Sequence, residues 1–287
     1  MSNPSETAMP RLSLNDGSSI PQVGFGSYQV PPADAAEVVG QALAAGYRHI
    51  DTAQMYGNEA GVGAAIAASG LPRDEIYVTT KLNNTFHRPA DVRSSFAASL
   101  DRLGLDRVDL FLIHWPLPTR YDGDYVSTWE AMLELAAEGG TRSVGVSNFQ
   151  PDHLERIIAA TGAVPAVNQI EAHPYFANDT ARMATRGHGA LVEAWSPIAR
   201  GEVLTDPVVT RIADELGRTP SQVTLRWHLE RGDIVFPKTM HADRMAENIA
   251  VTDFTLTPDQ VAAISALDRG EAGRQGPNPD TFDWIPD

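Results

Sequence analysis

Apolar and polar positions along this chain alternate in a repeated strand–helix pattern. Short runs rich in apolar residues predict strands at 23–26, 48–50, 76–80, 108–113, 142–146, 166–170, 190–194 and 233–236. Segments with apolar residues at helical spacing predict helices at 34–45, 58–69, 89–103, 127–138, 151–160, 178–186, 207–216, 220–230, 241–249 and 258–267. The helix at 89–103 is the clearest, because Pro89 suits a first turn and Val92, Phe96, Leu100 and Leu103 form one apolar stripe.

The number and order of these elements predict the fold class, which is α/β. Strands that alternate with helices pair in parallel, and eight such units close a (β/α)8 TIM barrel. A doubly wound open sheet is the alternative architecture. Asp16-Gly17 predicts the turn of a short N-terminal β-hairpin within residues 11–20, and the helix at 258–267 with the tail after it is additional to the barrel. No linker divides the chain, so we expect a single barrel domain over residues 1–287, with residues 1–10 as a loose tail.

Composition and charge exclude several classes of function. The 287 residues carry a net charge of -15 and include no cysteine. An acidic surface argues against nucleic acid or an anionic membrane as the partner, and the lack of cysteine excludes disulfides and thiolate catalysis. The N-terminus has no signal-peptide pattern, and no apolar run reaches transmembrane length. We therefore expect a cytoplasmic protein that acts on a small molecule, and we expect it to be a monomer.

Polar and aromatic side chains follow almost every predicted strand, where a (β/α)8 barrel carries its chemistry. They are Asp51, Lys81, His114, Ser147, Asn148, Gln169, Glu171, Trp195, Ser196, Lys238 and Thr239. Each has an ordinary explanation as well: Asp51 as a helix cap, Lys81 as a solvated amine, His114 as a local hydrogen-bond partner. The whole set of strand-end residues, rather than any one of them, favours a functional site at this end of the barrel.

Three of these positions, together with Tyr56, suit proton donation to a carbonyl oxygen. Tyr56 follows Asp51 in the same loop, and a free tyrosine has a pKa of about 10, so it needs help to act as an acid. A nearby Lys81 ammonium lowers the pKa of the phenol. Asp51 can keep that lysine charged, and His114 can align the carbonyl oxygen.

A proton delivered to oxygen requires a hydride delivered to carbon. With no cysteine and no metal-binding motif, a dissociable nicotinamide is the natural source, and we expect no metal. The amides of Asn148 and Gln169 can recognise its carboxamide, and Trp195 can stack on its ring.

A small basic cluster follows the eighth strand of this acidic chain. Lys238, His241 and Arg244 lie in the loop and helix start that often bind phosphate in barrels. A solvated helix face is the ordinary explanation of the cluster. Fixed basic groups beside an adenosine ribose favour a 2′-phosphate, so the expected cofactor is NADPH.

Other motifs and functions fit less well. The chain has no Gly-x-Gly-x-x-Gly after a strand, no P-loop and no His-Glu-x-x-His. A glycoside hydrolase using Asp51 with Glu171 or Glu193 is one alternative, but it leaves Lys81 without a role. A non-catalytic barrel that binds nucleotide and regulates a partner protein is the other.

Long motifs give the chain a family resemblance over nearly its whole length. They include Gly46-Tyr47-Arg48-His49-Ile50-Asp51-Thr52-Ala53, Tyr56-Gly57-Asn58-Glu59, Leu112-Ile113-His114-Trp115-Pro116, Gly145-Val146-Ser147-Asn148-Phe149, Asn168-Gln169-Ile170-Glu171 and Phe236-Pro237-Lys238-Thr239. With these motifs the chain resembles the aldo-keto reductase superfamily, and most closely its prokaryotic 2,5-diketo-D-gluconate reductase-like members. The resemblance implies a barrel oxidoreductase that reduces aldehydes and ketones with NADPH.

The resemblance also implies residue roles. It gives Asp51, Tyr56, Lys81 and His114 as the catalytic tetrad, with Tyr56 as the acid. It gives Ser147, Asn148, Gln169, Trp195, Ser196, Ile198, Leu204, Lys238, Thr239, Met240, Arg244, Glu247 and Asn248 as cofactor contacts.

The departures from the family concern the substrate. Many relatives have tryptophan where this chain has Tyr28 and Asn83. We therefore expect a wider and more polar substrate pocket, lined by Phe25, Tyr28, Asn83, His114 and Trp115, with Phe282 or Trp284 from the tail.

Overall fold

The computed structural model describes residues 9–286. Eight parallel strands form one sheet in the order β10-β9-β8-β7-β6-β5-β4-β3. Their bounds are β3 Phe25–Gly26, β4 His49–Asp51, β5 Tyr77–Leu82, β6 Val108–Ile113, β7 Thr141–Ser147, β8 Val167–Glu171, β9 Leu191–Trp195 and β10 Ile234–Val235. Val23 bridges Val235 in parallel, and the Gly24 N–H donates to the Val235 oxygen at 2.7 Å. These contacts join the two edges, so the fold is the expected (β/α)8 TIM barrel and the open sheet is wrong.

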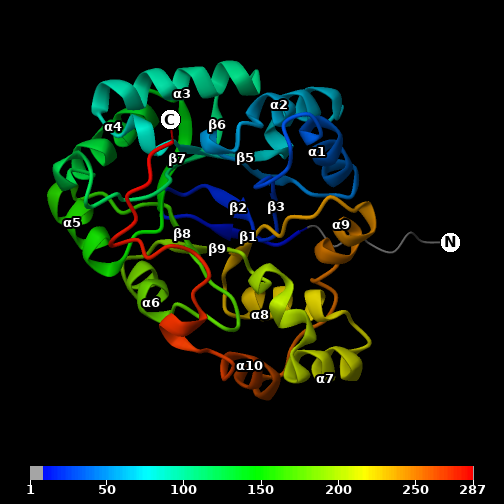
Figure 1. Cartoon of the computed structure of the whole chain (residues 1–287). Coiled ribbons are helices and arrows are strands. Elements are labelled where there is room, and N and C mark those ends of the chain that lie inside the picture. Colours follow the sequence, from blue (N-terminus) through cyan, green and yellow to red (C-terminus); the bar gives the residue numbers. More distant parts are fainter. Residues whose placement is uncertain (1–8, 287) are drawn as a thin grey trace.

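The helices lie around the outside of the strands (Figure 1). They are α1 Ala35–Ala44, α2 Glu59–Ala68, α3 Pro89–Leu103, α4 Val126–Ala137, α5 Pro151–Thr161, α6 Asp179–Gly187, α7 Pro207–Leu216, α8 Pro220–Glu230, α9 Ala242–Ile249 and α10 Pro258–Ser265. The bounds of α3 match the sequence prediction, with Pro89 in the first turn and Gly104 ending the helix in a left-handed conformation. In residues 9–286, no helix is both long and apolar enough to cross a bilayer.

The predicted hairpin closes the end of the barrel where the strands begin. Strands β1 Arg11–Ser13 and β2 Ser19–Pro21 pair antiparallel. Leu14 and Ile20 are buried with Tyr77 and Ile234, which stand at the starts of β5 and β10. The other end of the barrel is therefore the one open to a ligand. Of the expected loose tail, residues 1–8 lie outside the described range, while Met9 packs against the core.

Two glycines at the first barrel strand allow neighbouring segments to approach the backbone closely. A Cβ on Gly24 would lie 2.7 Å from His49 Nδ1, and one on Gly26 would lie 2.6 Å from the Phe236 backbone oxygen. Both distances are too short for a real contact, so only glycine lets β3 pack against its neighbours here.

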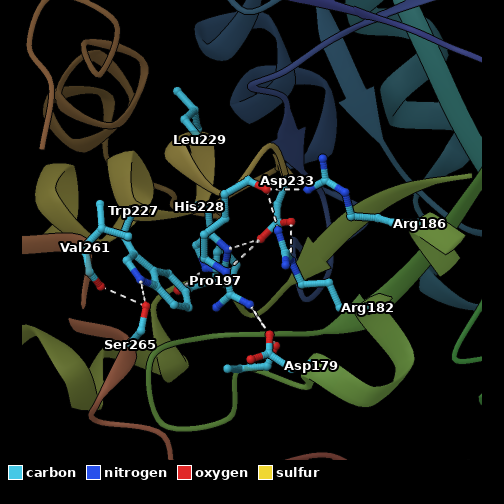
Figure 2. Close-up of polar contacts among 12 residues, drawn as sticks. Asp179, Arg182, Arg186, Pro197, Trp227, His228, Leu229, Asp233, Val261 and Ser265 are labelled. Carbon is cyan, nitrogen blue, oxygen red and sulfur yellow. Dashed lines mark hydrogen bonds and ion pairs between the residues drawn. The ribbon is translucent and has the colours of Figure 1, made fainter. Parts of the chain in front are cut away.

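A buried polar cluster ties the C-terminal half of the barrel together (Figure 2). Asp233, just before β10, accepts a hydrogen bond from Arg182 of α6 at 2.8 Å and contacts His228 Nδ1 at 3.3 Å. The other ring nitrogen of His228 lies 3.1 Å from the Pro197 carbonyl oxygen. The cluster thereby fixes the loop after β9, which carries Ser196 and Ile198, against α8.

Candidate active site

A buried ion pair lies at the open end of the barrel. Lys81 of β5 is fully buried and its Nζ lies 2.6 Å from Asp51 Oδ1, at the end of β4. Nζ also donates to the Thr52 backbone oxygen at 2.9 Å. Burial alone lowers the pKa of Lys81, but Asp51 and Tyr56 outweigh it and raise that pKa above its usual value. Lys81 is therefore a fixed positive charge.

Tyr56 is the third partner of this lysine. Lys81 Nζ donates to Tyr56 Oη at 3.3 Å, which leaves the phenol proton free for another acceptor. Burial raises the pKa of Tyr56 to about 12, against the lowering effect of Lys81. Lys81 does lower the pKa of the phenol, as expected, but burial of the hydroxyl is the larger effect. A phenol with this pKa stays protonated at neutral pH, as a proton donor must.

His114 lies across from Tyr56, with ring centroids 5.8 Å apart and the rings nearly perpendicular. It follows β6 and is mostly buried. Burial, Lys81 and His87 hold the pKa of His114 well below its ordinary value, so the imidazole is neutral. A neutral imidazole beside a phenol can donate one hydrogen bond to a shared acceptor without repelling Lys81.

The loop that carries Tyr56 is held by Asn58. Asn58 occupies the N-cap position of α2, but its side chain makes no cap hydrogen bond. Asn58 Nδ2 instead donates to the Ser27 and Val30 backbone oxygens, and its Oδ1 accepts from Thr52 Oγ1 at 2.8 Å. This buried side chain joins the loops after β3 and β4, so it supports the position of Tyr56.

Amide groups from β7 and β8 lie beside the ion pair with fixed orientations. Asn148 Nδ2 donates to the His114 backbone oxygen and to Ser147 Oγ, while its Oδ1 accepts from Trp195 Nε1 at 2.9 Å. Gln169 Nε2 donates to Asp51 Oδ2 at 2.9 Å and to Glu193 Oε2 at 3.0 Å. The amide hydrogens of both residues are thus used within the protein. Gln169 Oε1 remains for a ligand, and Asn148 Oδ1, which already accepts from Trp195, keeps one lone pair.

The basic cluster after β10 is exposed. Lys238, His241 and Arg244 all face solvent, and among the described residues none of them forms a salt bridge. His241 is the N-cap residue of α9, whose first turn contains Arg244. Free cations at a helix N-terminus suit a phosphate group.

The remaining predicted cofactor residues have varied environments. Ser196 and Ile198 are half-buried in the loop after β9, and Leu204 packs against the second apolar cluster beside that loop. Thr239 is buried and Met240 is exposed. Glu247 Oε1 accepts from Thr219 Oγ1, and Asn248 Oδ1 accepts from Ser221 Oγ, both at 2.7 Å. These two contacts hold α9 against α8.

The residues expected around a substrate divide into two groups. Tyr28 is exposed with its ring 5.1 Å from that of Tyr56, and Trp115 stacks on Phe282 of the tail at 4.2 Å. Asn83 is half-buried and uses its oxygen to cap the turn at Thr85. Phe25, in contrast, is fully buried and packs edge-on against Tyr47. Its ring belongs to the hydrophobic core, so its burial does not support its assignment to the pocket.

The tail crosses the open end of the barrel and is held by a carboxylate that the sequence did not assign to it. Glu171 accepts the backbone N–H groups of Gln275 at 2.6 Å and Gly276 at 2.9 Å. A Cβ on Gly276 would lie 2.4 Å from Trp195, so the tail packs directly on that indole. Farther on, the Trp284 backbone oxygen accepts from Asn84.

The described residues contain one group with metal-ligating side chains close together, Asp152, His153 and Asp280. His153 Nδ1 accepts the Gln150 backbone N–H at 3.1 Å, so a neutral ring carries its proton on Nε2. His153 Nε2 lies 3.7 Å from Asp280 Oδ1. Neither ring nitrogen offers a free lone pair, and the contact acts as a further attachment of the tail.

The structure also bears on the alternative of a glycoside hydrolase that uses Asp51 with Glu171 or Glu193. Asp51 and Glu193 are almost completely buried, and the Gln169 amide nitrogen lies between them. Glu171 is occupied by the tail. These carboxyl groups do not face a common space where a sugar and a water could lie between them.

Comparisons with known proteins identify the family of this chain. Residues 22–269 match the sequence pattern described as the Aldo/keto reductase family. An aldo-keto reductase of Mycolicibacterium smegmatis is 48% identical over 275 residues, covering 96% of this chain and 98% of that protein. A mutant of the protein Gox0644 in complex with NADPH has a TM-score of 0.92, 42% identity, and coverage of 96% of this chain and 100% of that one. The Bombyx mori aldo-keto reductase in complex with NADP has a TM-score of 0.86, 36% identity, and coverage of 91% and 94%.

Proposed function

The chain belongs to the aldo/keto reductase family, and on that premise we propose that it reduces aldehydes and ketones to alcohols with NADPH, using Tyr56 as the general acid. The observation that carries the residue roles is the contact of Lys81 Nζ with both Asp51 Oδ1 and Tyr56 Oη, at 2.6 and 3.3 Å. A buried ammonium in this position stabilises a phenolate as it forms.

Each member of the tetrad has a separate task. Reduced nicotinamide supplies a hydride to the carbonyl carbon when it is bound. Tyr56 donates its phenol proton to the carbonyl oxygen, because Lys81 occupies its oxygen as a donor and leaves the O–H free. His114 donates a hydrogen bond to the same oxygen from its neutral ring and so aligns the carbonyl group. Asp51 keeps Lys81 in place and charged.

The residues around the tetrad suit NADPH. The oxygen atoms of Gln169 and Asn148 are acceptors, as the carboxamide nitrogen of a nicotinamide requires. Trp195 is held by its indole N–H and presents a fixed ring for stacking. Lys238 and Arg244 are exposed cations that suit a 2′-phosphate.

The proposed reaction is tested by mixing the purified protein with NADPH and a panel of small aldehydes and ketones. NADPH oxidation should occur with reactive aldehydes, and each alcohol should appear in equal amount to the NADPH consumed. The same panel with no nicotinamide should give no product. Binding of NADPH without turnover on any carbonyl compound would favour the regulatory alternative instead.

Arg244→Ala should weaken the use of NADPH without affecting NADH. Loss of one charged hydrogen bond to a phosphate should raise the KM for NADPH by about tenfold, while the KM for NADH, which lacks the 2′-phosphate, stays the same. Steady-state kinetics with both cofactors measure this difference. Arg93→Ala is the matched control, because Arg93 is an exposed arginine of α3 that pairs with Glu134 and Glu138. An equal change in the KM for both cofactors would show that Arg244 does not bind the 2′-phosphate.

A further inference from the structure

Glu193 lies in the middle of β9, where the surrounding strand is apolar. It is fully buried and sits beside Gln169 in the β8–β9 register. Its Oε2 accepts one hydrogen of Gln169 Nε2 at 3.0 Å, and the other hydrogen goes to Asp51 Oδ2 at 2.9 Å. The Gln169 amide therefore links Asp51, the carboxylate of the tetrad, to the carboxyl group of Glu193.

This arrangement fixes which end of the amide faces the cofactor. The oxygen and nitrogen of a glutamine amide have nearly the same shape, so a flip is controlled by hydrogen-bond partners rather than by packing. Two acceptors inside the barrel hold Nε2 inward. Gln169 Oε1 accepts no hydrogen bond from the described residues. It is also not one of their fully buried polar atoms that lack a hydrogen-bond partner. The flipped amide would lose both contacts and would point its oxygen at the carboxylate of Asp51, which pairs with Lys81.

The charged and titratable groups that face Glu193 come from β4 and β5. They are Asp51 with its partner Lys81, the imidazole of His49 and the phenol of Tyr77. Burial holds the pKa of His49 at about 3, so the ring is neutral, and its Nε2 lies 3.9 Å from Glu193 Oε1. Burial and the negative charge of Asp51 raise the pKa of Glu193 to about 8. At neutral pH Glu193 is thus a neutral carboxylic acid, which glutamine copies in shape and charge.

We propose that Glu193 is a positioning residue for cofactor recognition: it holds the Gln169 amide so that the amide oxygen, and not its nitrogen, meets the nicotinamide carboxamide. The proposal rests on the proposed function, because it assumes that a nicotinamide binds at this end of the barrel. Without Glu193, one of the two acceptors that orient Nε2 is lost, and one of the two amide hydrogens is left without a buried acceptor, while the other still reaches Asp51 Oδ2.

Two substitutions separate positioning from general structural support. Glu193→Met removes the acceptor while keeping a side chain of similar length, and Glu193→Gln keeps an acceptor in the same place. Binding is measured with NADPH and with adenosine 2′,5′-bisphosphate, which has the adenosine phosphates but no nicotinamide. Should Glu193→Met fail to fold, Glu193→Leu removes the same acceptor.

For Glu193→Met we expect the Kd of NADPH to rise by about tenfold, while the Kd of the bisphosphate stays within about twofold. Glu193→Gln should bind both ligands as the wild-type protein does. The inference is overturned if Glu193→Met binds NADPH normally, or if both ligands weaken equally, which would indicate a structural role. Wild-type protein that neither binds nor oxidises NADPH would instead refute the proposed function, so the two failures are distinguishable.

Discussion

Tyr56→Phe should lower the turnover number by about a hundredfold to ten-thousandfold, the usual contribution of a positioned general acid. The substitution removes the proton donor and keeps the ring, which contacts Tyr28 and His114. Because the hydroxyl is also the acceptor of a Lys81 hydrogen bond, its loss leaves that ammonium with Asp51 and the Thr52 oxygen, so the ion pair persists. The Kd of NADPH should therefore change by less than about twofold, in keeping with a loss confined to the transition state.

The measurement is the steady-state turnover of a reactive aldehyde, together with NADPH binding by titration. Tyr175→Phe is the control, since the Tyr175 hydroxyl donates to Asp206 and is not part of the tetrad. Full turnover in Tyr56→Phe would mean that another group protonates the carbonyl oxygen. A large loss of NADPH binding would mean that the phenol supports the cofactor rather than the proton transfer.

Lys81→Met should abolish measurable turnover and also destabilise the protein. Asp51 would remain buried with no opposite charge, and breaking a buried ion pair on one side costs about 3–5 kcal/mol of unfolding free energy. Tyr56 would lose the positive charge that lowers its pKa, so phenolate formation in the transition state would become harder. Turnover and urea unfolding are measured on the same preparation.

A double variant separates the two effects of Lys81. In Lys81→Met with Asp51→Asn, the buried negative charge is gone, so much of the lost stability should return. Turnover should stay lost, because no ammonium remains beside Tyr56. Recovery of turnover in the double variant would show that Lys81 acts only by neutralising Asp51, and the proposed role in proton transfer would be wrong.

Several parts of the fold and of the site could be read from local sequence. The stripe of Val92, Phe96 and Leu103 gave the bounds of α3, because helical spacing is a property of one segment. The ends of β4, β5 and β6 placed Asp51, Lys81 and His114 at one end of a parallel barrel. The distances among them follow from that closure and could not be read from the residues themselves.

Other features of the site depend on contacts between segments. Phe25 was expected to line the pocket, but its ring is fully buried in the hydrophobic core beside Tyr47. Asn58 stands at the N-cap position of α2, yet its side chain bonds to the loop of Ser27 and Val30 instead of capping the helix. The pKa of Tyr56 depends on how completely its hydroxyl is buried, which no sequence spacing reveals.

The sequence by itself determined the order of strands and helices, the barrel class and the set of polar groups delivered to its open end, because periodicity and residue type are local properties. Only the tertiary structure decided which of these groups touch. Closing the sheet brought Gln169 of β8 between Asp51 of β4 and Glu193 of β9, and it brought the tail to Glu171. Such contacts join segments far apart in the chain, and their geometry exists only once the whole barrel has closed.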